Sequence, residues 1–444
     1  MELTNNITTS DTAQTAWTKE WWTNFLDASD FFKDSILIPD VMDEETVASF
    51  NDMTGSMLRE IFIRQNTSYD FRLYLNGKSQ SRKYMVDNLF NSPPLTTESL
   101  AEWASRTFAD EKFGLIINSG EKFSNEMAEK IAVYLNPLLE EAGLPLKGIN
   151  ITVFVGNYGF TPLGIHTDHP GENVMHLHLG PGEKTMYNWE MEAYKEIAGD
   201  VSNNKNIAPL LPFAKAFQLR TGDVYFMPWN KFHIGNTEDF SVGLSVWYNN
   251  MPLNRLFENL IKSFKYQYLK KDDTNDKSNI VGPYKAPDAE EGFEQILSAL
   301  EMDDVRLKTS LKDLTREVFE SYILSLYSNQ GWKSRPISVE DELALKGLKL
   351  NESTFLHLKD KIIHAPESYK ITYKILESGQ LRIYARGTKI EIKYHPELVA
   401  IIQKLNEGGS YQTEELLKEL NKEWPEQAGL YILNLLFLNR AIVY

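Results

Sequence analysis

The middle of the chain contains short runs rich in β-branched and aromatic residues, each separated from the next by glycine, proline or asparagine. These runs cover 151–155, 174–179, 185–189, 223–227 and 241–248. Runs of this length and composition are typical of strands, and no regular helical segment separates them. Strands that follow one another through turns predict an antiparallel barrel or sandwich, not a parallel sheet with crossover helices.

The segments on both sides of this region have a helical period. Helix and loop are expected in the first third, with helical spacing of apolar residues in 99–108 and 126–139. After Pro252, apolar stripes at helical spacing recur in 253–264, 293–300 and 311–326. The polar stretch 270–289 between the first two stripes is expected to be a loop. A helical block at this place packs within its own chain or forms a dimer interface, and the sequence leaves both open.

The last hundred residues have the pattern of a separate small domain. Two alternating runs, 369–376 and 381–384, flank Ser378 and Gly379 as the arms of a hairpin, and 389–394 follows as a strand. Helical patterns then cover 396–405, 414–420 and 429–444, the last of them ending in a short strand. This combination favours a winged-helix-like domain. The domain division expected from the sequence is 1–250, 251–345 and 346–444.

Composition and charge narrow the possible chemistry. The chain has no cysteine, which excludes disulfides, thiolate nucleophiles, cysteine-bound zinc and iron–sulfur clusters, so any metal must use His and carboxylate ligands. A formal charge of −16 disfavours binding to DNA or RNA. It would attract a basic peptide or protein, although an ordinary acidic surface is the simpler explanation. No signal peptide and no apolar run long enough for a membrane span is present, so a cytoplasmic protein is expected.

A metal-binding pattern lies in the strand-rich region, which contains five of the eight histidines. His166 and Asp168 are two positions apart, so on a strand both side chains leave by the same face. His233 follows a Gly-Asp turn, an apolar strand and a proline-containing loop, and is expected to be the third ligand. Two imidazoles and one carboxylate form the facial triad of non-haem iron(II) oxygenases, which leaves coordination positions open for reactants.

The residues around this pattern resemble the Jumonji-C branch of the Fe(II)/2-oxoglutarate oxygenases, especially the bacterial ribosomal-oxygenase type. The resemblance is carried by 150–168 (NITVFVGNYGFTPLGIHTD), by 174–189 (VMHLHLGPGEKTMYNW) and by the strand 241–248. It implies an α+β protein with a double-stranded β-helix (jelly-roll, cupin-like) core, a helical surround, a helical middle domain that forms a dimer, and a C-terminal winged helix.

The resemblance also implies a reaction and further site residues. The protein would use Fe(II) and 2-oxoglutarate to hydroxylate a side chain of a protein or peptide. The acidic surface of the chain is compatible with a basic substrate. Lys184 stands where the family binds the distal carboxylate of 2-oxoglutarate, and Thr161, Ser245 and Trp247 are expected beside it. Related halogenases have a small residue in place of the carboxylate ligand. Because this chain has Asp168 at that position, the resemblance implies hydroxylation or demethylation and not halogenation.

Two other interpretations of the same region stay open. His176, His178 and Glu183 have the HxH-x4-E spacing of a cupin metal site, which His233 would complete and which would act on a small molecule. Against this site, Glu183 falls in a Gly-Pro-Gly turn, whereas a metal ligand needs the fixed direction of a strand. The third interpretation is a cupin-like binding protein without catalytic turnover.

Overall fold

The structure, a computed structural model, describes residues 16–65, 71–269, 293, 297–345, 347, 357–420 and 424–444. The expected loop 270–289 lies outside these residues. The chain forms two compact units, Met1–Asn250 with Ser325–Tyr444, and Met251–Leu324. The three-domain division expected from the sequence stays a prediction.

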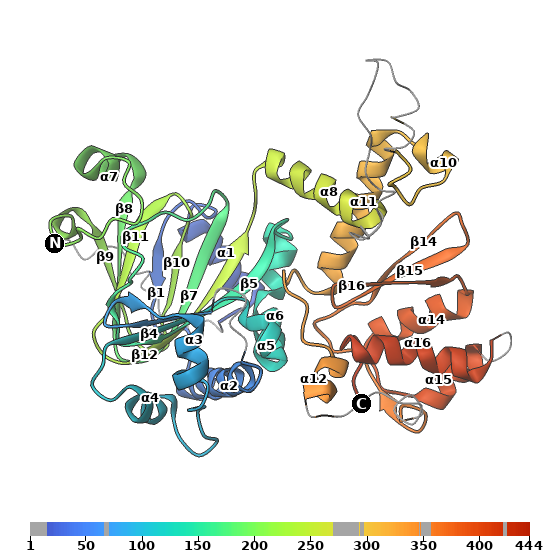
Figure 1. The fold of residues 1–444 in the computed structure, drawn as a ribbon, viewed down its shortest axis with the longest axis horizontal. Coiled ribbons are helices and arrows are strands. Elements are labelled where there is room, and N and C mark those ends of the chain that lie inside the picture. Colours follow the sequence, from blue (N-terminus) through green and yellow to red (C-terminus); the bar gives the residue numbers. More distant parts are fainter. Residues whose placement is uncertain are drawn as a thin grey trace. The chain divides into compact units, whose positions relative to one another are not determined.

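Two antiparallel sheets form the strand-rich part of the first unit (Figure 1). The larger sheet has the strand order β1-β10-β7-β12-β5-β4-β2-β3, and the smaller one has the order β6-β11-β8-β9. Their bounds are β1 Ile36–Ile38, β2 Arg72–Leu75, β3 Lys78–Ser79, β4 Phe113–Ile117, β5 Gly148–Gly156, β6 Gly159–Phe160, β7 Glu172–Pro181, β8 Lys184–Glu190, β9 Lys215–Leu219, β10 Val224–Met227, β11 Lys231–Thr237 and β12 Ser241–Asn249. The predicted strands are thus confirmed as β5, β7, β8, β10 and β12, and the antiparallel sheets are confirmed with them.

Alternation along the strands gives the larger sheet two different faces. On β12, Leu244 and Val246 enter the main hydrophobic core, whereas Ser245 and Trp247 between them line a cavity. The same alternation holds on β5 and β7, as expected for side chains that point to opposite faces of a strand. Residues of both sheets, including Val174 and Phe217, form a further apolar cluster. The two sheets therefore pack against each other, with the polar residues of their inner faces gathered at the cavity.

Helices cover the outer face of the larger sheet, because their apolar stripes share its core. This core includes Trp22, Phe50, Trp103 and Leu135, one from each of four helices, all 3% exposed or less. The helices of this part are α1 Lys19–Ala28, α2 Glu44–Ile63, α3 Arg82–Tyr84, α4 Leu100–Phe108, α5 Gly120–Phe123, α6 Asn125–Ala142 and α7 Met191–Ala198, with a π-helical turn at Met85–Leu89 and a 3-10 turn at Leu211–Phe213. The helices expected in 99–108 and 126–139 are confirmed as α4 and α6.

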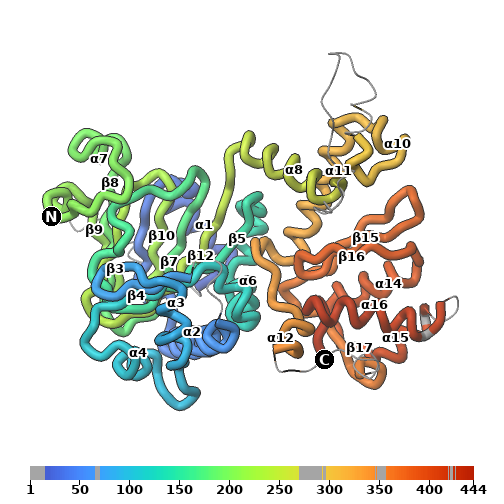
Figure 2. Tube along the Cα trace, in the orientation of Figure 1, coloured from blue at the N-terminus to red at the C-terminus, as the bar shows by residue number. Residues whose placement is uncertain are grey.

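The first third also contains strands that the sequence did not predict. β1, β2, β3 and β4 belong to the larger sheet, where β1 pairs with β10 and β4 pairs with β5. In Figure 2 the blue N-terminal strands accordingly lie beside the strands of the middle region, at the two edges of the larger sheet. The prediction of helices and loops without strands was therefore wrong for this region. The apolar run of β4, FGLII, is buried along its whole length and has no alternation that would mark it as a strand.

The C-terminal part of the first unit combines helices with small sheets around its own core. The expected hairpin is confirmed, since β14 pairs with β15, and β15 pairs in turn with β16. The bounds are β13 Ile362–Ile363, β14 Thr372–Ile375, β15 Gln380–Ala385, β16 Thr388–Lys393, β17 Tyr411–Gln412, α12 Val339–Leu345, α14 Pro396–Asn406, α15 Thr413–Leu420 and α16 Glu426–Leu438.

The second unit is helical, as the apolar stripes in 253–264 and 311–326 predicted, whereas most of the predicted stripe 293–300 lies outside the described residues. Its helices are α8 Leu253–Tyr268, α10 Asp304–Leu307 and α11 Leu311–Ser328, the last of which continues into the first unit. Arg306 bonds to Tyr268 and Glu317 and so joins these helices to one another. Among the described residues, no helix combines the length and the apolar character that crossing a bilayer would need.

Candidate metal centre

His166 and His233 face each other across an antiparallel bridge between two backbone segments. The His166 backbone N–H donates to the His233 carbonyl at 3.2 Å, and the reverse bond measures 2.8 Å. Phe232 and Ile234, the neighbours of His233 on β11, point to the other side of the strand and pack in the cluster that also holds Ile165. Gly164 has φ +88°, and a Cβ there would lie 2.7 Å from the Asn204 carbonyl oxygen. The segment that carries His166 is therefore held tightly on both sides.

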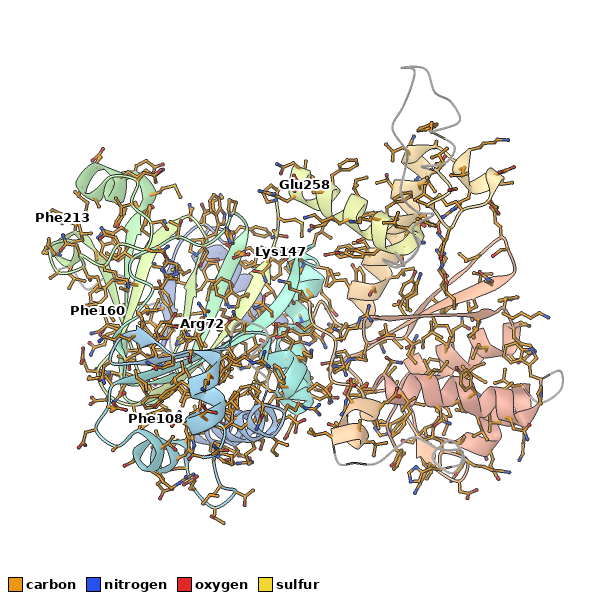
Figure 3. The ribbon with its side chains drawn as sticks, viewed as in Figure 1. Arg72, Phe108, Lys147, Phe160, Phe213 and Glu258 are labelled. Carbon is orange, nitrogen blue, oxygen red and sulfur yellow. The ribbon has the colours of Figure 1, made fainter. Side chains whose placement is uncertain are left out.

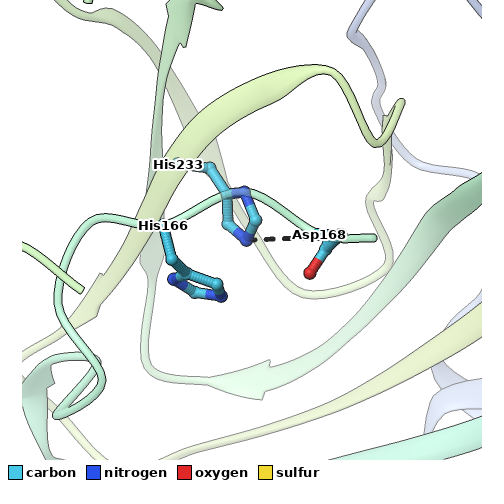
Figure 4. A group of neighbouring side chains, drawn as sticks. All are labelled: His166, Asp168 and His233. Atoms are coloured by element: carbon cyan, nitrogen blue, oxygen red, sulfur yellow. Dashed lines mark ion pairs between the residues drawn. The ribbon is translucent and has the colours of Figure 1, made fainter. Parts of the chain in front are cut away.

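Asp168 completes the group. Its Oδ2 lies 3.9 Å from Nε2 of His233, and one ligand atom from each of the three side chains lies within 4.8 Å of the others. Figure 4 shows the three side chains directed toward a common point. Among the described residues, this is the group of His and carboxylate side chains that could hold a metal ion.

Backbone carbonyls orient both imidazoles. Nδ1 of His166 lies 2.9 Å from the Gly164 oxygen, and Nδ1 of His233 lies 3.2 Å from the Lys231 oxygen. A ring nitrogen that faces a carbonyl carries the proton, so the Nε2 lone pair of each ring is left for a metal. Such carbonyl contacts fix the tautomer and the ring orientation of metal-binding histidines.

Burial sets the protonation of the three groups. It lowers the pKa of His166 and of His233 to about 4, so both rings are neutral at neutral pH. It raises the pKa of Asp168 to about 7. Oδ2 of Asp168 is buried and has no hydrogen-bond partner among the described residues. Two neutral nitrogen donors and a carboxylate oxygen that lacks a partner fit a divalent cation, which would offset the desolvation of the carboxylate.

Lys184 lies in the same cavity and is only 5% exposed. Its Nζ donates to the Tyr158 hydroxyl at 3.2 Å and lies 4.9 Å from the centre of the Phe154 ring. No carboxylate of the described residues forms an ion pair with it. A buried ammonium is costly without an anionic partner, so this position fits an acid group of a bound ligand.

The other expected site residues border the same cavity. Thr161 and Lys184 approach each other at Gly235, where a Cβ would lie 3.1 Å from Cε of Lys184 and 3.4 Å from Oγ1 of Thr161. Ser245 shares a 3.0 Å hydrogen bond with Nδ1 of His176. The Trp247 ring N–H donates to the Thr152 hydroxyl at 3.0 Å. The structure thus brings Thr161, Ser245 and Trp247 to one cavity with Lys184 and the three candidate ligands.

The alternative set of His176, His178 and Glu183 does not form such a group. Glu183 is exposed, and its carboxylate contacts Gln218 and lies 3.7 Å from Arg220. Nε2 of His178 lies 2.7 Å from the Gly182 carbonyl oxygen, and His178 does not line the cavity, whereas His176 does. The turn that carries Glu183 therefore directs its carboxylate away from the two histidines.

The cavity has a volume of about 1300 Å³, and parts of its wall were not expected from the sequence. Phe154 lines the cavity, and Tyr158 accepts the hydrogen bond from Lys184; both lie in the strand-rich motif, but nothing in their spacing marks them. Lys333 and Arg335 line the cavity from beyond the helical block. Only the folded chain brings that segment back, so no local pattern could have revealed it.

The inner cavity between the antiparallel sheets thus combines a His-Asp-His group that fits a divalent cation with a buried lysine that fits an acid group of a ligand. Comparison with solved structures finds YcfD, a ribosomal oxygenase from Escherichia coli, at 14% identity and TM-score 0.46, covering 95% of this chain and 97% of that chain. The same protein in complex with cobalt and 2-oxoglutarate matches at 14% identity and TM-score 0.45, with the same coverage. SnoK, a non-heme alpha-ketoglutarate-dependent carbocyclase from nogalamycin biosynthesis, matches at 13% identity and TM-score 0.32, covering 56% of this chain and 87% of that chain.

No protein-family model and no curated protein matches the sequence. The role of each side chain follows from its own contacts in this chain.

Proposed function

We propose that this chain is an Fe(II)/2-oxoglutarate-dependent oxygenase that hydroxylates a side chain of a protein or peptide. The observation that carries the proposal is the presence, in one cavity, of two neutral imidazoles, a carboxylate with a buried oxygen, and a buried ammonium that pairs with no carboxylate of the described residues. A metal held by a facial triad keeps open positions for reactants, and a dicarboxylate co-substrate needs a fixed cation. The sequence resemblance to Jumonji-C oxygenases independently predicts the same residues.

Each residue then has a definite task. Nε2 of His166, Nε2 of His233 and a carboxylate oxygen of Asp168 would hold the iron. Lys184 would bind the distal carboxylate of 2-oxoglutarate, with Thr161, Ser245 and Trp247 around the co-substrate. The bound iron would supply the oxidation: dioxygen is consumed, 2-oxoglutarate is converted to succinate and carbon dioxide, and one oxygen atom enters a C–H bond of the substrate.

The finer assignments of fold and assembly belong to the same proposal. We interpret the two facing sheets as a double-stranded β-helix, and the helices with the hairpin at the C-terminal end as a winged helix. The segment expected to form a dimer, 251–345, includes α8, on which Leu253 is 84% and Phe257 is 49% exposed. Apolar side chains this exposed are consistent with self-association.

The direct test measures succinate formed from 2-oxoglutarate by the iron-loaded protein, first alone and then with a cell lysate. Mass spectrometry of the lysate should show a peptide that gains one oxygen atom in an enzyme-dependent and 2-oxoglutarate-dependent manner. Binding of iron without any succinate, with or without lysate, would contradict the oxygenase and favour a binding protein.

A further inference from the structure

The charges that line the cavity differ in sign from those of the whole chain. The chain has 46 Lys and Arg against 62 Asp and Glu. In the cavity the cationic side chains outnumber the carboxylates of Asp168, Glu172 and Asp341. The cationic residues are Arg72, Lys122, Lys147, Lys184, Lys333 and Arg335. The net charge of the chain therefore does not describe the electrostatic field inside the cavity. At short range, the charged side chains of the lining determine that field.

The carboxylates of the lining are already engaged. Glu172 forms an ion pair with Lys147, a residue that Figure 3 labels together with Arg72. Asp341 accepts a 2.8 Å hydrogen bond from the Ser338 hydroxyl at the start of α12. The carboxylate of Asp168 belongs to the candidate metal centre. Even with all three carboxylates counted at full charge, the six cationic side chains leave the lining with a surplus of positive charge.

Two of the cations, Lys333 and Arg335, stand on a segment whose backbone is fixed against the larger sheet. The Ile149 N–H donates to the Gly331 oxygen at 2.7 Å, and the Lys333 N–H donates to the Ile149 oxygen at 2.8 Å. The Asn329 amide donates to the Trp332 and Ser334 oxygens at 3.0 and 2.9 Å. These hydrogen bonds therefore fix the segment in place as part of the cavity wall.

The side chains of Lys333 and Arg335 are exposed, and neither forms an ion pair with another described residue. Lys122, from α5, lines the same cavity, and its carbonyl accepts a 3.3 Å bond from the Ile337 N–H at the end of this segment. Cations from two distant parts of the sequence are thus brought to one opening. This arrangement suits the recognition of an anion by several charge-assisted bonds.

On the basis of the oxygenase function proposed above, we propose that the protein or peptide substrate presents an acidic group to this cavity, held by Lys333 and Arg335. This is the opposite of the basic substrate with which the net charge of the chain is compatible. The chain's negative surface would then repel acidic partners at long range, while the cavity wall selects them at contact.

The test compares three peptides of the same length, hexaglutamate, hexaglutamine and hexalysine, each with a neutral fluorophore. Fluorescence anisotropy is measured with the full-length protein loaded with Co(II) and saturating 2-oxoglutarate. Hexaglutamate should bind most tightly, and added salt should weaken it. The Lys333→Gln/Arg335→Gln variant should bind it roughly tenfold more weakly, as expected for the loss of charge-assisted bonds.

The matched control is Lys262→Gln/Lys265→Gln, which makes the same change in net charge at exposed positions of α8 outside the cavity. Its affinity for hexaglutamate should stay within about twofold of wild type, because exposed distant charges are screened by salt. Tighter binding of hexalysine, or an equal loss of affinity in both variants, would overturn the inference. Binding of Co(II) and 2-oxoglutarate is measured separately by calorimetry, so a failure of the proposed oxygenase is told apart from a failure of the acidic substrate.

Discussion

Two pairs of histidines lie in the strand-rich part of this protein, and their surroundings show what distinguishes a candidate metal site from two buried histidines. All four rings are buried or nearly so, and burial lowers the pKa of each below its usual value. In the first pair, His166 and His233, Nδ1 faces a carbonyl and Asp168 lies beside Nε2 of His233. In the second pair, His176 and His178, the adjacent carboxylate of Glu183 is held at the surface. A converging carboxylate, and not the spacing of the histidines, distinguishes the two pairs.

Loss of iron is the largest effect expected, and it should be confined to the first pair. His166→Ala and His233→Ala each remove one of three ligands, so anaerobic titration should detect no stoichiometric iron binding in either variant. His176→Ala and His178→Ala should bind iron like wild type. The comparison fails if the second pair of variants loses iron or the first pair keeps it.

A second prediction concerns acid stability and His178. Burial, with the charge of Lys184, lowers the pKa of His178 to about 4, whereas an unfolded histidine titrates near 6.5. Between these values the unfolded chain binds the extra proton, so the free energy of unfolding falls as the pH is lowered from about 6.5 to 4. This group alone accounts for up to about 3 kcal/mol of that loss.

The measurement is urea unfolding of wild type and His178→Gln at several pH values. Gln does not titrate and its amide can still donate to the Gly182 carbonyl, so the variant should lose less stability on acidification. Lys215→Gln, at an exposed position on β9, serves as the control and should follow wild type. Parallel curves for wild type and His178→Gln would show that His178 is not buried in its neutral form.

A smaller effect is expected for the co-substrate. Lys184→Ala removes a charge-assisted bond worth about 2 kcal/mol, which corresponds to roughly thirtyfold weaker 2-oxoglutarate binding. Iron binding should be unchanged, because Lys184 is not a ligand. Calorimetric titration of 2-oxoglutarate into the iron-loaded protein under argon measures both properties. An unchanged affinity for 2-oxoglutarate would show that Lys184 does not bind the co-substrate.

The smallest effect tests whether His176 is packed as part of the sheet. A Cβ at Gly243 would clash with the His176 ring, so Gly243→Ala should cost about 1 kcal/mol of stability by overpacking. Combination with His176→Ala should remove this cost, because the ring that clashes is gone. Urea unfolding of the two single variants and the double variant measures the coupling. Strictly additive effects would show that the ring lies elsewhere.

The sequence predicted what depends on local pattern. Alternation and turn residues identified β5, β7, β12 and their neighbours, and the HxD spacing identified the two candidate ligands that one backbone segment carries. β4 was missed because both faces of its strand are buried, which removes the alternation. Lys333 and Arg335 were missed for another reason: their segment is held at the cavity by the backbone bonds of Gly331 and Lys333 to Ile149, and such long-range pairing leaves no pattern in the neighbouring sequence.

The backbone bonds between Ile149 and the segment around Lys333 join two parts of the chain that are synthesised at different times. On the ribosome, the nascent chain exposes His166, Asp168 and His233 long before 331–337 has been translated. Until that segment arrives, the N–H and carbonyl of Ile149 lack the backbone partners that they have in the folded chain. The candidate metal group and the proposed substrate contact are therefore encoded by separate stretches of the chain, and the stretch with the candidate metal group is synthesised first.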